Sequence, residues 1–357
     1  MNYLTLCTVE ELAEVTAERA GETKSGQSMQ VLDASRLHAG QLDYETLQAE
    51  LKAARQRGNK FAVLGIPEDI TPRANLGRGG ADGAWASFLR SWCNLQDNRF
   101  WDCASVLLLG CVDCRDLQER STRADVETLR GLCAELDQRV EAAVTAVVSA
   151  GLIPVVIGGG HGGAWGIGKG AAAGLLRLRE GIAVVNCDPH GDYRALEGRH
   201  SGNAFSYAGQ AGWLKRYHVL GMHESYNSES MLQRMSGGGA SWITFEDIFV
   251  RCRTSWEEAL RTSAEMLRET GLPVGIEVDM DSIADMPSSA VLPYGLTLRE
   301  AARFVHYMAS CLPYVYLHLA EAAPSLGSDG ERRTGRGLAW LASVFVKAAA
   351  DNSRIML

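Results

Sequence analysis

Short apolar runs and longer amphipathic stretches alternate along most of this chain. The apolar runs carry few polar residues and end at Gly, Pro or Asp, which is typical of strands buried on both faces of a sheet. They predict strands at residues 61–66, 105–109, 154–157, 182–185, 217–221 and 241–245, and in the apolar stretches just before Asp279 and Glu321.

The amphipathic stretches predict helices between these strands. Leu47, Leu51 and Ala54, for example, share one face of a helix at residues 43–57. Further helices are predicted at residues 124–149, 256–269, 295–310 and 337–351. Because strands and helices alternate, we expect parallel strands joined by right-handed crossovers. No repeat or linker divides the pattern, so residues 42–357 are predicted to form one doubly wound α/β domain, and residues 1–41 a peripheral lead-in.

The composition narrows the class of protein. The 357 residues include 46% hydrophobic and 22% charged residues, and the formal net charge is −8. We therefore expect a soluble globular protein with neither nucleic acid nor an anionic membrane as its main partner. The nine cysteines are an odd number in a long chain without a signal-peptide pattern, which favours reduced thiols and a cytoplasmic location. Polar residues, Gly and Pro interrupt the longest apolar stretch, residues 142–157, and argue against a membrane span.

A group of polar residues follows the predicted strand at 182–185. Asp188, His190 and Asp192 are spaced two apart, and an extended backbone points alternate side chains to one face. Two carboxylates and an imidazole in one small volume are costly unless a cation joins them. Taken alone, this stretch fits a metal site and an ordinary polar turn equally well.

Two further stretches favour the metal site. His161 follows the predicted strand at 154–157 within GGGHGG, and ligands of open α/β sheets bind beyond the carboxyl ends of the strands. Asp279 and Asp281 again stand two apart at the end of an apolar strand, where the alternative is an acidic turn that caps a helix. A second pair of carboxylates that needs a cation makes a metal site the better interpretation.

These stretches supply six oxygen and nitrogen donors and no thiolate: His161, Asp188, His190, Asp192, Asp279 and Asp281. This set suits one or two Mn²⁺-like ions better than a structural zinc. Two divalent ions can share a water, lower its pKa and so provide a nucleophile at neutral pH. The sequence therefore predicts a hydrolase.

With these residues the chain resembles the ureohydrolase superfamily, which includes arginase, agmatinase and formimidoylglutamase. The resemblance begins near residue 61 and rests on GGGH at 158–161, DxHxD at 188–192, SGN at 201–203, DMD at 279–281 and ExxP at 321–324. It implies an arginase-like metallohydrolase domain, built as a three-layer α/β/α sandwich with a mainly parallel eight-stranded sheet. It also implies two Mn²⁺ ions per chain held by the six donors, with Ni²⁺, Co²⁺ or Fe²⁺ as substitutes, and a homo-oligomer, either a trimer or a hexamer.

The resemblance further implies roles around the metal site. Asp192 orients the nucleophile and relays a proton, and Glu321 holds the amidine or guanidinium group of the substrate. Arg78 lies in a glycine-rich loop and offers a planar set of donors, although a flexible loop with a solvated Arg fits the same residues. The predicted substrate-binding residues in this region are Asn75, Arg78, Ser201 and Asn203.

Several positions favour the formimidoylglutamase branch over arginase. The stretches GGGHxxAWG at 158–166 and NxGRxGA at 75–81 resemble that branch, and Phe205 stands where arginases carry a histidine. Arg194 extends the metal motif to DxHxDxR, and its guanidinium needs an anionic partner, which a small amidine or guanidino substrate with a free carboxylate supplies. We therefore expect hydrolysis of N-formimidoyl-L-glutamate to glutamate and formamide.

Other positions keep alternatives open. Gly162 stands where formimidoylglutamases usually have Glu, and SGN at 201–203 is closer to arginases. A guanidino-acid hydrolase that releases urea is therefore the alternative. A related single-zinc deacetylase would not need His161 or the full DMD pair, and a non-catalytic metal-stabilised protein would not need Glu321.

Overall fold

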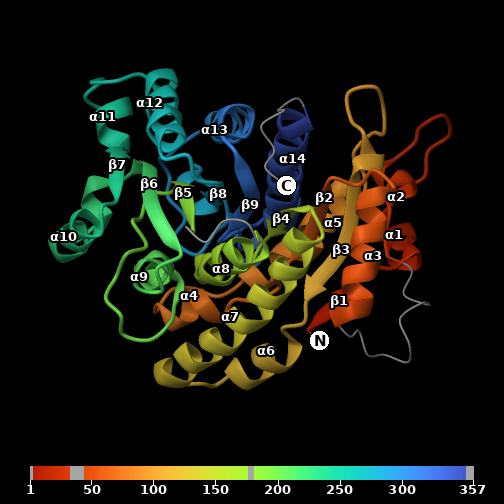
Figure 1. The fold of residues 1–357 in the computed structure, drawn as a ribbon, viewed down its shortest axis with the longest axis horizontal. Coiled ribbons are helices and arrows are strands. Elements are labelled where there is room, and N and C mark those ends of the chain that lie inside the picture. Colours follow the sequence, from red (N-terminus) through yellow and green to blue (C-terminus); the bar gives the residue numbers. More distant parts are fainter. Residues whose placement is uncertain (1–2, 33–43, 176–180, 351–357) are drawn as a thin grey trace.

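The computed structural model describes residues 3–32, 44–175 and 181–350, and its strands form a single sheet (Figure 1). The strand order is β1-β3-β2-β4-β9-β8-β5-β6-β7. All neighbouring strands are parallel except β1, which runs antiparallel to β3. The strands are β1 (Leu4–Leu6), β2 (Phe61–Gly65), β3 (Val106–Val112), β4 (Ile153–Ile157), β5 (Ile182–Cys187), β6 (Leu214–Met222), β7 (Ser241–Thr244), β8 (Val274–Asp279) and β9 (Tyr314–Ala320).

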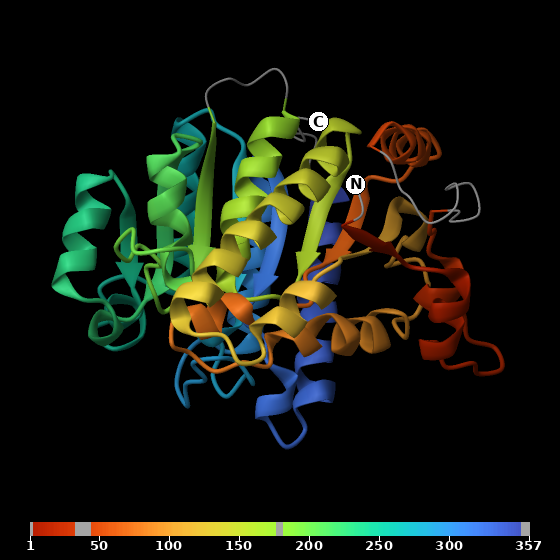
Figure 2. The same ribbon diagram turned by 90° about the horizontal axis from the view of Figure 1, so that it is seen from below.

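Helices cover both faces of this sheet and make three layers (Figures 1 and 2). One hydrophobic core lies between the sheet and α5, α12, α13 and α14, and a second between the sheet and α3, α7, α8 and α9. The helices are α1 (Val9–Val15), α2 (Ser25–Ser28), α3 (Tyr44–Gln56), α4 (Ile70–Ala74), α5 (Ala84–Trp92), α6 (Arg115–Ser121), α7 (Val126–Ser149), α8 (Ala164–Gly174), α9 (Ala204–Gln210), α10 (Glu229–Gly237), α11 (Phe245–Phe249), α12 (Trp256–Glu269), α13 (Leu298–Cys311) and α14 (Gly330–Ala350).

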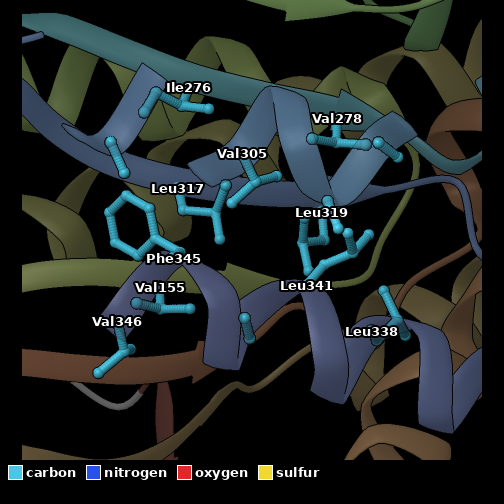
Figure 3. Packing of buried hydrophobic residues seen from close by; sticks show 14 of the residues in the cluster. Val155, Ile276, Val278, Val305, Leu317, Leu319, Leu338, Leu341, Phe345 and Val346 are labelled. Atoms are coloured by element: carbon cyan, nitrogen blue, oxygen red, sulfur yellow. The ribbon is translucent and has the colours of Figure 1, made fainter. Parts of the chain in front are cut away.

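Alternate residues of the central strands enter the two cores. Val155 of β4 and Leu317 of β9 lie in the same core as Val305 of α13 and Phe345 of α14 (Figure 3), whereas Val156 belongs to the core on the other face. All five side chains are fully buried. Burying an aliphatic or aromatic side chain of this size contributes about 1.5–3 kcal/mol, so both faces of the sheet contribute to stability. This explains why the strands read as continuous apolar runs rather than as alternating ones.

Capping residues fix where the long helices begin. Oδ1 of Asp125 accepts a hydrogen bond from the Thr128 N–H at 2.8 Å before α7. Thr297 and Glu300 form a capping box before α13, in which each side chain accepts the other residue's backbone N–H. Helix α13 therefore begins at Leu298 and not at residue 295 as predicted, because Thr297 satisfies N–H groups that the first turn leaves free.

The predicted α/β/α sandwich is confirmed, but the described sheet has nine strands where eight were expected. The added strand is β1, whose residues Leu4–Leu6 pair with β3. Three residues are too few to show a strand period in sequence. Some predictions concern positions outside the described residues. These are residues 33–41 of the lead-in, residue 43 at the start of a predicted helix and residue 351 at the end of another. The boundary between lead-in and domain stays a prediction.

Two further observations concern the longest apolar stretch, residues 142–157, and the nine cysteines. No helix among the described residues is long and apolar enough to cross a membrane. All nine cysteines are free thiols.

His218 is a buried neutral imidazole in β6, and it predicts a pH dependence of stability. Its two ring nitrogens lie 2.9 Å from Ser241 Oγ and 2.8 Å from Ser263 Oγ, and burial lowers its pKa to about 3. Between pH 6.5 and about 3 the unfolded chain therefore binds a proton that the folded chain does not, and stability falls as the pH falls. In this pH range His218 contributes about 1.4 kcal/mol per pH unit to the slope of the unfolding free energy against pH. We expect the variant His218→Gln to lose this contribution, as measured by urea unfolding at several pH values. The control His306→Gln, on α13, should keep the full wild-type slope; an unchanged slope in His218→Gln would contradict the assignment.

Candidate metal centre

Four neighbouring strands in the middle of the sheet bring the predicted metal ligands together. His161 follows β4, Glu321 follows β9, Asp279 ends β8 and Asp188 follows β5, and these strands are adjacent in the order β4-β9-β8-β5. The carboxyl ends of parallel strands lie at one edge of a sheet. Residues that are far apart in the chain therefore meet in one small volume.

Glycines shape the loop that places His161. Gly158 and Gly159 have φ values of 80° and 75°, which favour glycine over other residues. A Cβ on Gly160 would lie only 2.2 Å from Thr71 Oγ1, so the loop packs directly against α4. The Gly160 N–H donates to the buried Glu68 carboxylate at 2.6 Å. Glu68 was not singled out from the sequence, and it ties α4 to the loop that carries His161.

Three aspartates converge on one nitrogen of His161. Carboxylate oxygens lie 3.0–3.1 Å from its Nδ1 atom, and they belong to Asp188, Asp192 and Asp279. All four side chains are buried. The candidate ligand atoms of this group lie within 4.8 Å of one another.

A second group lies beside the first and shares Asp279 with it. It consists of His190, Asp279 and Asp281, whose candidate ligand atoms also lie within 4.8 Å of one another. His190 Nδ1 lies 3.4 Å from Asp188 Oδ1 and 3.9 Å from Asp281 Oδ2. The two groups together contain the six predicted donors. Their arrangement forms adjacent clusters suited to a binuclear metal site.

The electrostatics of the clusters favour a cation. Burial, followed by the charges of Asp281 and Asp188, raises the pKa of Asp279 well above its ordinary range. Burial also opposes a charge on His161, yet the surrounding carboxylates raise its pKa well above the usual value. So many buried carboxylates cannot all ionise unless positive charge balances them. Oxygen and imidazole donors without thiolate fit divalent ions such as Mn²⁺, so the residues present fit the predicted metal.

Asp192 and Glu321 have an unusual backbone in common. Their φ values are 46° and 65°, a left-handed conformation that non-glycine residues rarely adopt. The Glu321 N–H donates to the Gly159 carbonyl at 2.9 Å, and Glu321 Oε1 accepts from the His161 N–H at 2.7 Å. Glu321 Oε2 is buried and has no hydrogen-bond partner among the described residues. Backbone strain of this kind is concentrated at functional sites.

A buried carboxylate behind His161 was missed from the sequence. Glu277 Oε2 lies 3.5 Å from His161 Nε2 and 2.6 Å from His318 Nδ1, and Tyr316 donates to Glu277 Oε1 at 2.8 Å. A carboxylate on the far nitrogen fixes the tautomer and orientation of a ligating histidine. The available signal was a charged residue inside an apolar strand. His318, a buried residue of β9, is part of this layer.

A cavity of about 470 Å³ opens beside the two clusters. Its walls include His190, Asp192, Asp279, Asp281 and Glu321. Three of the predicted substrate-binding residues line it as well: Asn75, Arg194 and Ser201. The Asn75 amide donates to Ser201 Oγ at 3.3 Å, so the glycine-rich loop and the SGN turn meet at this wall.

Arg78 and Asn203, also predicted to bind substrate, are not among the residues that line this cavity. The Arg78 guanidinium donates to the Ser289 and Ser288 carbonyls at 2.9 and 3.2 Å. The Asn203 amide donates to the Ala195 and Gly198 carbonyls, and its Oδ1 accepts from Arg199 at 2.8 Å. Both side chains therefore brace loops around the site through these hydrogen bonds.

Two further polar residues beside the site hold its loops in place. Arg199 is buried, pairs with Asp137 at 2.8 Å and donates to the Gly162 carbonyl at 2.8 Å, so it is neither a solvated charge nor a cavity residue. Asn227 Oδ1 accepts from the Gly191 N–H at 2.8 Å, and its amide donates to the Pro189 carbonyl. Asn227 thus holds the loop that carries the three ligands Asp188, His190 and Asp192.

Buried His and Asp clusters at the carboxyl edge of a doubly wound sheet, open to a polar cavity, define a metal-dependent hydrolase. The model of the arginase family matches residues 59–346. The chain belongs to the arginase family and is a hydrolase of the ureohydrolase type.

Individual relatives agree with this family. The chain is 27% identical over 290 residues to formimidoylglutamase of Chromobacterium violaceum, a match that covers 78% of this chain and 86% of that protein. It resembles the crystal structure of formimidoylglutamase from Bacillus subtilis with a TM-score of 0.73 and 16% identity, over 95% of both chains. Trypanosoma cruzi formiminoglutamase, crystallised with two Mn²⁺ ions, gives a TM-score of 0.65 and 20% identity over 85% of this chain and 98% of that one. These structures share the fold.

Proposed function

We propose that this chain hydrolyses N-formimidoyl-L-glutamate to L-glutamate and formamide. The observation that carries the proposal is Arg194, which lines the same cavity as Glu321 and the metal clusters. Its guanidinium has no hydrogen-bond or ion-pair partner within residues 3–32, 44–175 and 181–350. An unpaired guanidinium recognises a carboxylate, which this substrate carries and agmatine lacks. Curated relatives named formimidoylglutamase support the same substrate.

The metal ligands in this proposal are the six clustered side chains His161, Asp188, His190, Asp192, Asp279 and Asp281. Bound Mn²⁺ ions supply positive charge that activates water for attack. The Glu277 carboxylate lies 3.5 Å behind His161 Nε2, and the Asp281 N–H donates to Asp279 Oδ1 at 2.7 Å, which fixes that carboxylate. These contacts hold the donors in place before substrate binds.

Two carboxylates act on the substrate. Glu321 Oε2, buried and without a partner in the described chain, accepts an N–H of the amidinium and holds the amidine carbon for attack by water. Asp192 accepts a proton from that water and passes it to the amine nitrogen as the carbon–nitrogen bond breaks. The carbon leaves as formamide, and the amine becomes the α-amino group of glutamate.

A guanidino acid is the second candidate substrate, and its carbon would leave as urea. Ser201 of the arginase-like SGN turn lines the cavity, which supports this alternative. Gly162 stands where formimidoylglutamases usually have Glu, but it does not decide between the two candidate substrates. A Cβ at this position would already lie 2.6 Å from side-chain atoms of Thr71, so local packing alone accounts for the glycine. Any side chain at that position would need α4 to move.

Turnover of four compounds tests the proposal. We expect Mn²⁺-reconstituted protein to release formamide from N-formimidoyl-L-glutamate and no urea from arginine, agmatine or 4-guanidinobutyrate. The variant Arg194→Gln should lower kcat/KM for N-formimidoyl-L-glutamate by about 10- to 100-fold, because one charged hydrogen bond to the substrate is lost. The control Arg253→Gln removes an exposed guanidinium that pairs with Asp247, and should behave as wild type. Urea from a guanidine would transfer the assignment to the second candidate.

A further inference from the structure

The cavity beside the metal clusters has walls of opposite charge. Its inner wall carries carboxylates, among them Glu321 and Asp281. Its outer wall carries two guanidinium groups, Arg194 and Arg234. The second of these was not singled out from the sequence. A ligand that fits both walls carries an amidinium at one end and negative charge at the other.

Arg194 is held by its backbone and leaves its side chain free. Its N–H donates to the Gly202 carbonyl at 2.9 Å, and its carbonyl accepts from Ser206 Oγ at 2.5 Å. The side chain lies against the SGN turn, since a Cβ on Gly202 would lie 3.2 Å from Arg194 Nε. Among the described residues no acceptor pairs with this guanidinium. Its hydrogen-bond donors are available to a ligand.

Arg234 of α10 lies on the same wall as Arg194. Its Nε–H donates to the Tyr193 carbonyl at 3.2 Å, which is the peptide group that leads directly into Arg194. No acceptor in the described part of the chain pairs with the two Nη groups of Arg234. The two free guanidinium groups are therefore anchored to one short segment.

Close packing fixes α10 against the metal loop. A Cβ on Gly191, between His190 and Asp192, would lie 2.6 Å from Met235 Sδ. A Cβ on Gly238 would lie 2.5 Å from the Tyr193 hydroxyl. Arg234 is thus carried by a helix that packs directly against the loop of the metal ligands.

One further carboxylate of the cavity already has partners of its own. Glu197 lines the cavity, but its Oε1 lies 3.2 Å from Arg130 Nη2 and 3.2 Å from His200 Nε2. The Gly202 N–H donates to His200 Nδ1 at 3.2 Å, so the proton of this imidazole is on Nε2 and points to Glu197. Glu197 is thus engaged elsewhere, and neither Arg194 nor Arg234 forms an ion pair among the described residues.

We propose that Arg194 and Arg234 bind the two carboxylates of one substrate, so that the chain selects dianionic amidines. The inference rests on the proposed function and sharpens it, because a substrate with one carboxylate can pair with only one of the two guanidinium groups. N-formimidoyl-L-glutamate has two carboxylates, whereas guanidinobutyrate and arginine have one. The second guanidinium thus separates the two candidate substrate classes.

Matched substrates test the subsite. N-formimidoyl-L-glutamine keeps the shape of N-formimidoyl-L-glutamate and loses the side-chain carboxylate, and N-formimidoyl-isoglutamine loses the α-carboxylate. We expect wild-type protein to prefer the diacid to each amide by about 10- to 100-fold in kcat/KM. Arg234→Gln should lose most of the preference for the diacid over one of the two amides, and Arg194→Gln most of the preference for the diacid over the other amide. The control Arg253→Gln should keep both preferences. Equal kcat/KM for the diacid and both amides in the wild type would overturn the inference.

Binding without turnover separates this inference from the proposed function. Glutarate carries two carboxylates and no amidine, and butyrate carries one, so calorimetric titration of Mn²⁺-loaded protein measures the subsite alone. We expect glutarate to bind at least about tenfold more tightly than butyrate, and Arg234→Gln to abolish this difference with an unchanged melting temperature. If no amidine turns over but glutarate binding depends on both arginines, the proposed reaction fails and the dicarboxylate subsite stands. Equal binding of the two acids, or a difference that survives Arg234→Gln, would refute the subsite.

Discussion

The variant Glu321→Gln is expected to lower kcat/KM by about 10²- to 10³-fold while the protein keeps its bound Mn²⁺. The reason is the contrast between the two oxygens of this carboxylate. Oε1 is fixed by the His161 N–H at 2.7 Å, and Oε2 is buried with no partner in the described residues. An amide offers only one oxygen. It must either leave the His161 N–H without an acceptor or place an NH₂ group against the N–H groups of the amidinium.

Metal analysis and steady-state kinetics on the same preparation measure both parts of this expectation. Glu321 belongs to neither metal cluster, so the Mn²⁺ content should stay at the wild-type value. Glu331→Gln is a suitable control, because Glu331 is an exposed residue of α14 that pairs with Arg90. Activity within about threefold of wild type in Glu321→Gln would contradict a contact between Glu321 and the substrate.

The strands of this fold could be predicted from the sequence, but their order could not. Apolar runs marked eight strands because parallel strands are buried on both faces. Each predicted ligand also stood at the end of such a run. That β4, β9, β8 and β5 are neighbours depends on crossover connections, and the spacing of residues along the chain does not encode these. His161 and Asp279 were grouped because both follow apolar strands, and ligands bind at the carboxyl ends of such strands.

Side-chain direction within the loops could not be predicted from the sequence. Arg78 and Asn203 lie in the right loops, yet their side chains point to backbone carbonyls and not to the cavity. A loop has no fixed period, so position alone does not determine where a side chain points. Arg234 shows the opposite case. It lies on a polar helix face that reads as solvated, and only the packing of α10 against Gly191 brings it to the cavity.

Replacing Asp279 with Asn is expected to change stability in opposite directions with and without metal. Asp279 is shared by both clusters, so the variant should lose the thermal stabilisation that Mn²⁺ gives the wild type. A ligand present at about 100 times its dissociation constant adds about 2.7 kcal/mol, which for a chain of this length corresponds to about 3–6 °C. Turnover should be lost with the metal.

The metal-free protein gives the more informative half of this experiment. Burial and the charges of Asp281 and Asp188 raise the folded-state pKa of Asp279. In the unfolded chain the same carboxyl group ionises freely near neutral pH, so the raised pKa lowers the free energy of unfolding there. Asn keeps an oxygen that can accept the Asp281 N–H and removes the charge. After dialysis against EDTA, Asp279→Asn should therefore melt at or above the metal-free wild type, whereas the control Asp329→Asn, at an exposed ion pair with Arg332, should respond to Mn²⁺ like the wild type. A metal-free variant that melts well below the wild type, or one that Mn²⁺ still stabilises fully, would show that Asp279 supports the fold and not the metal.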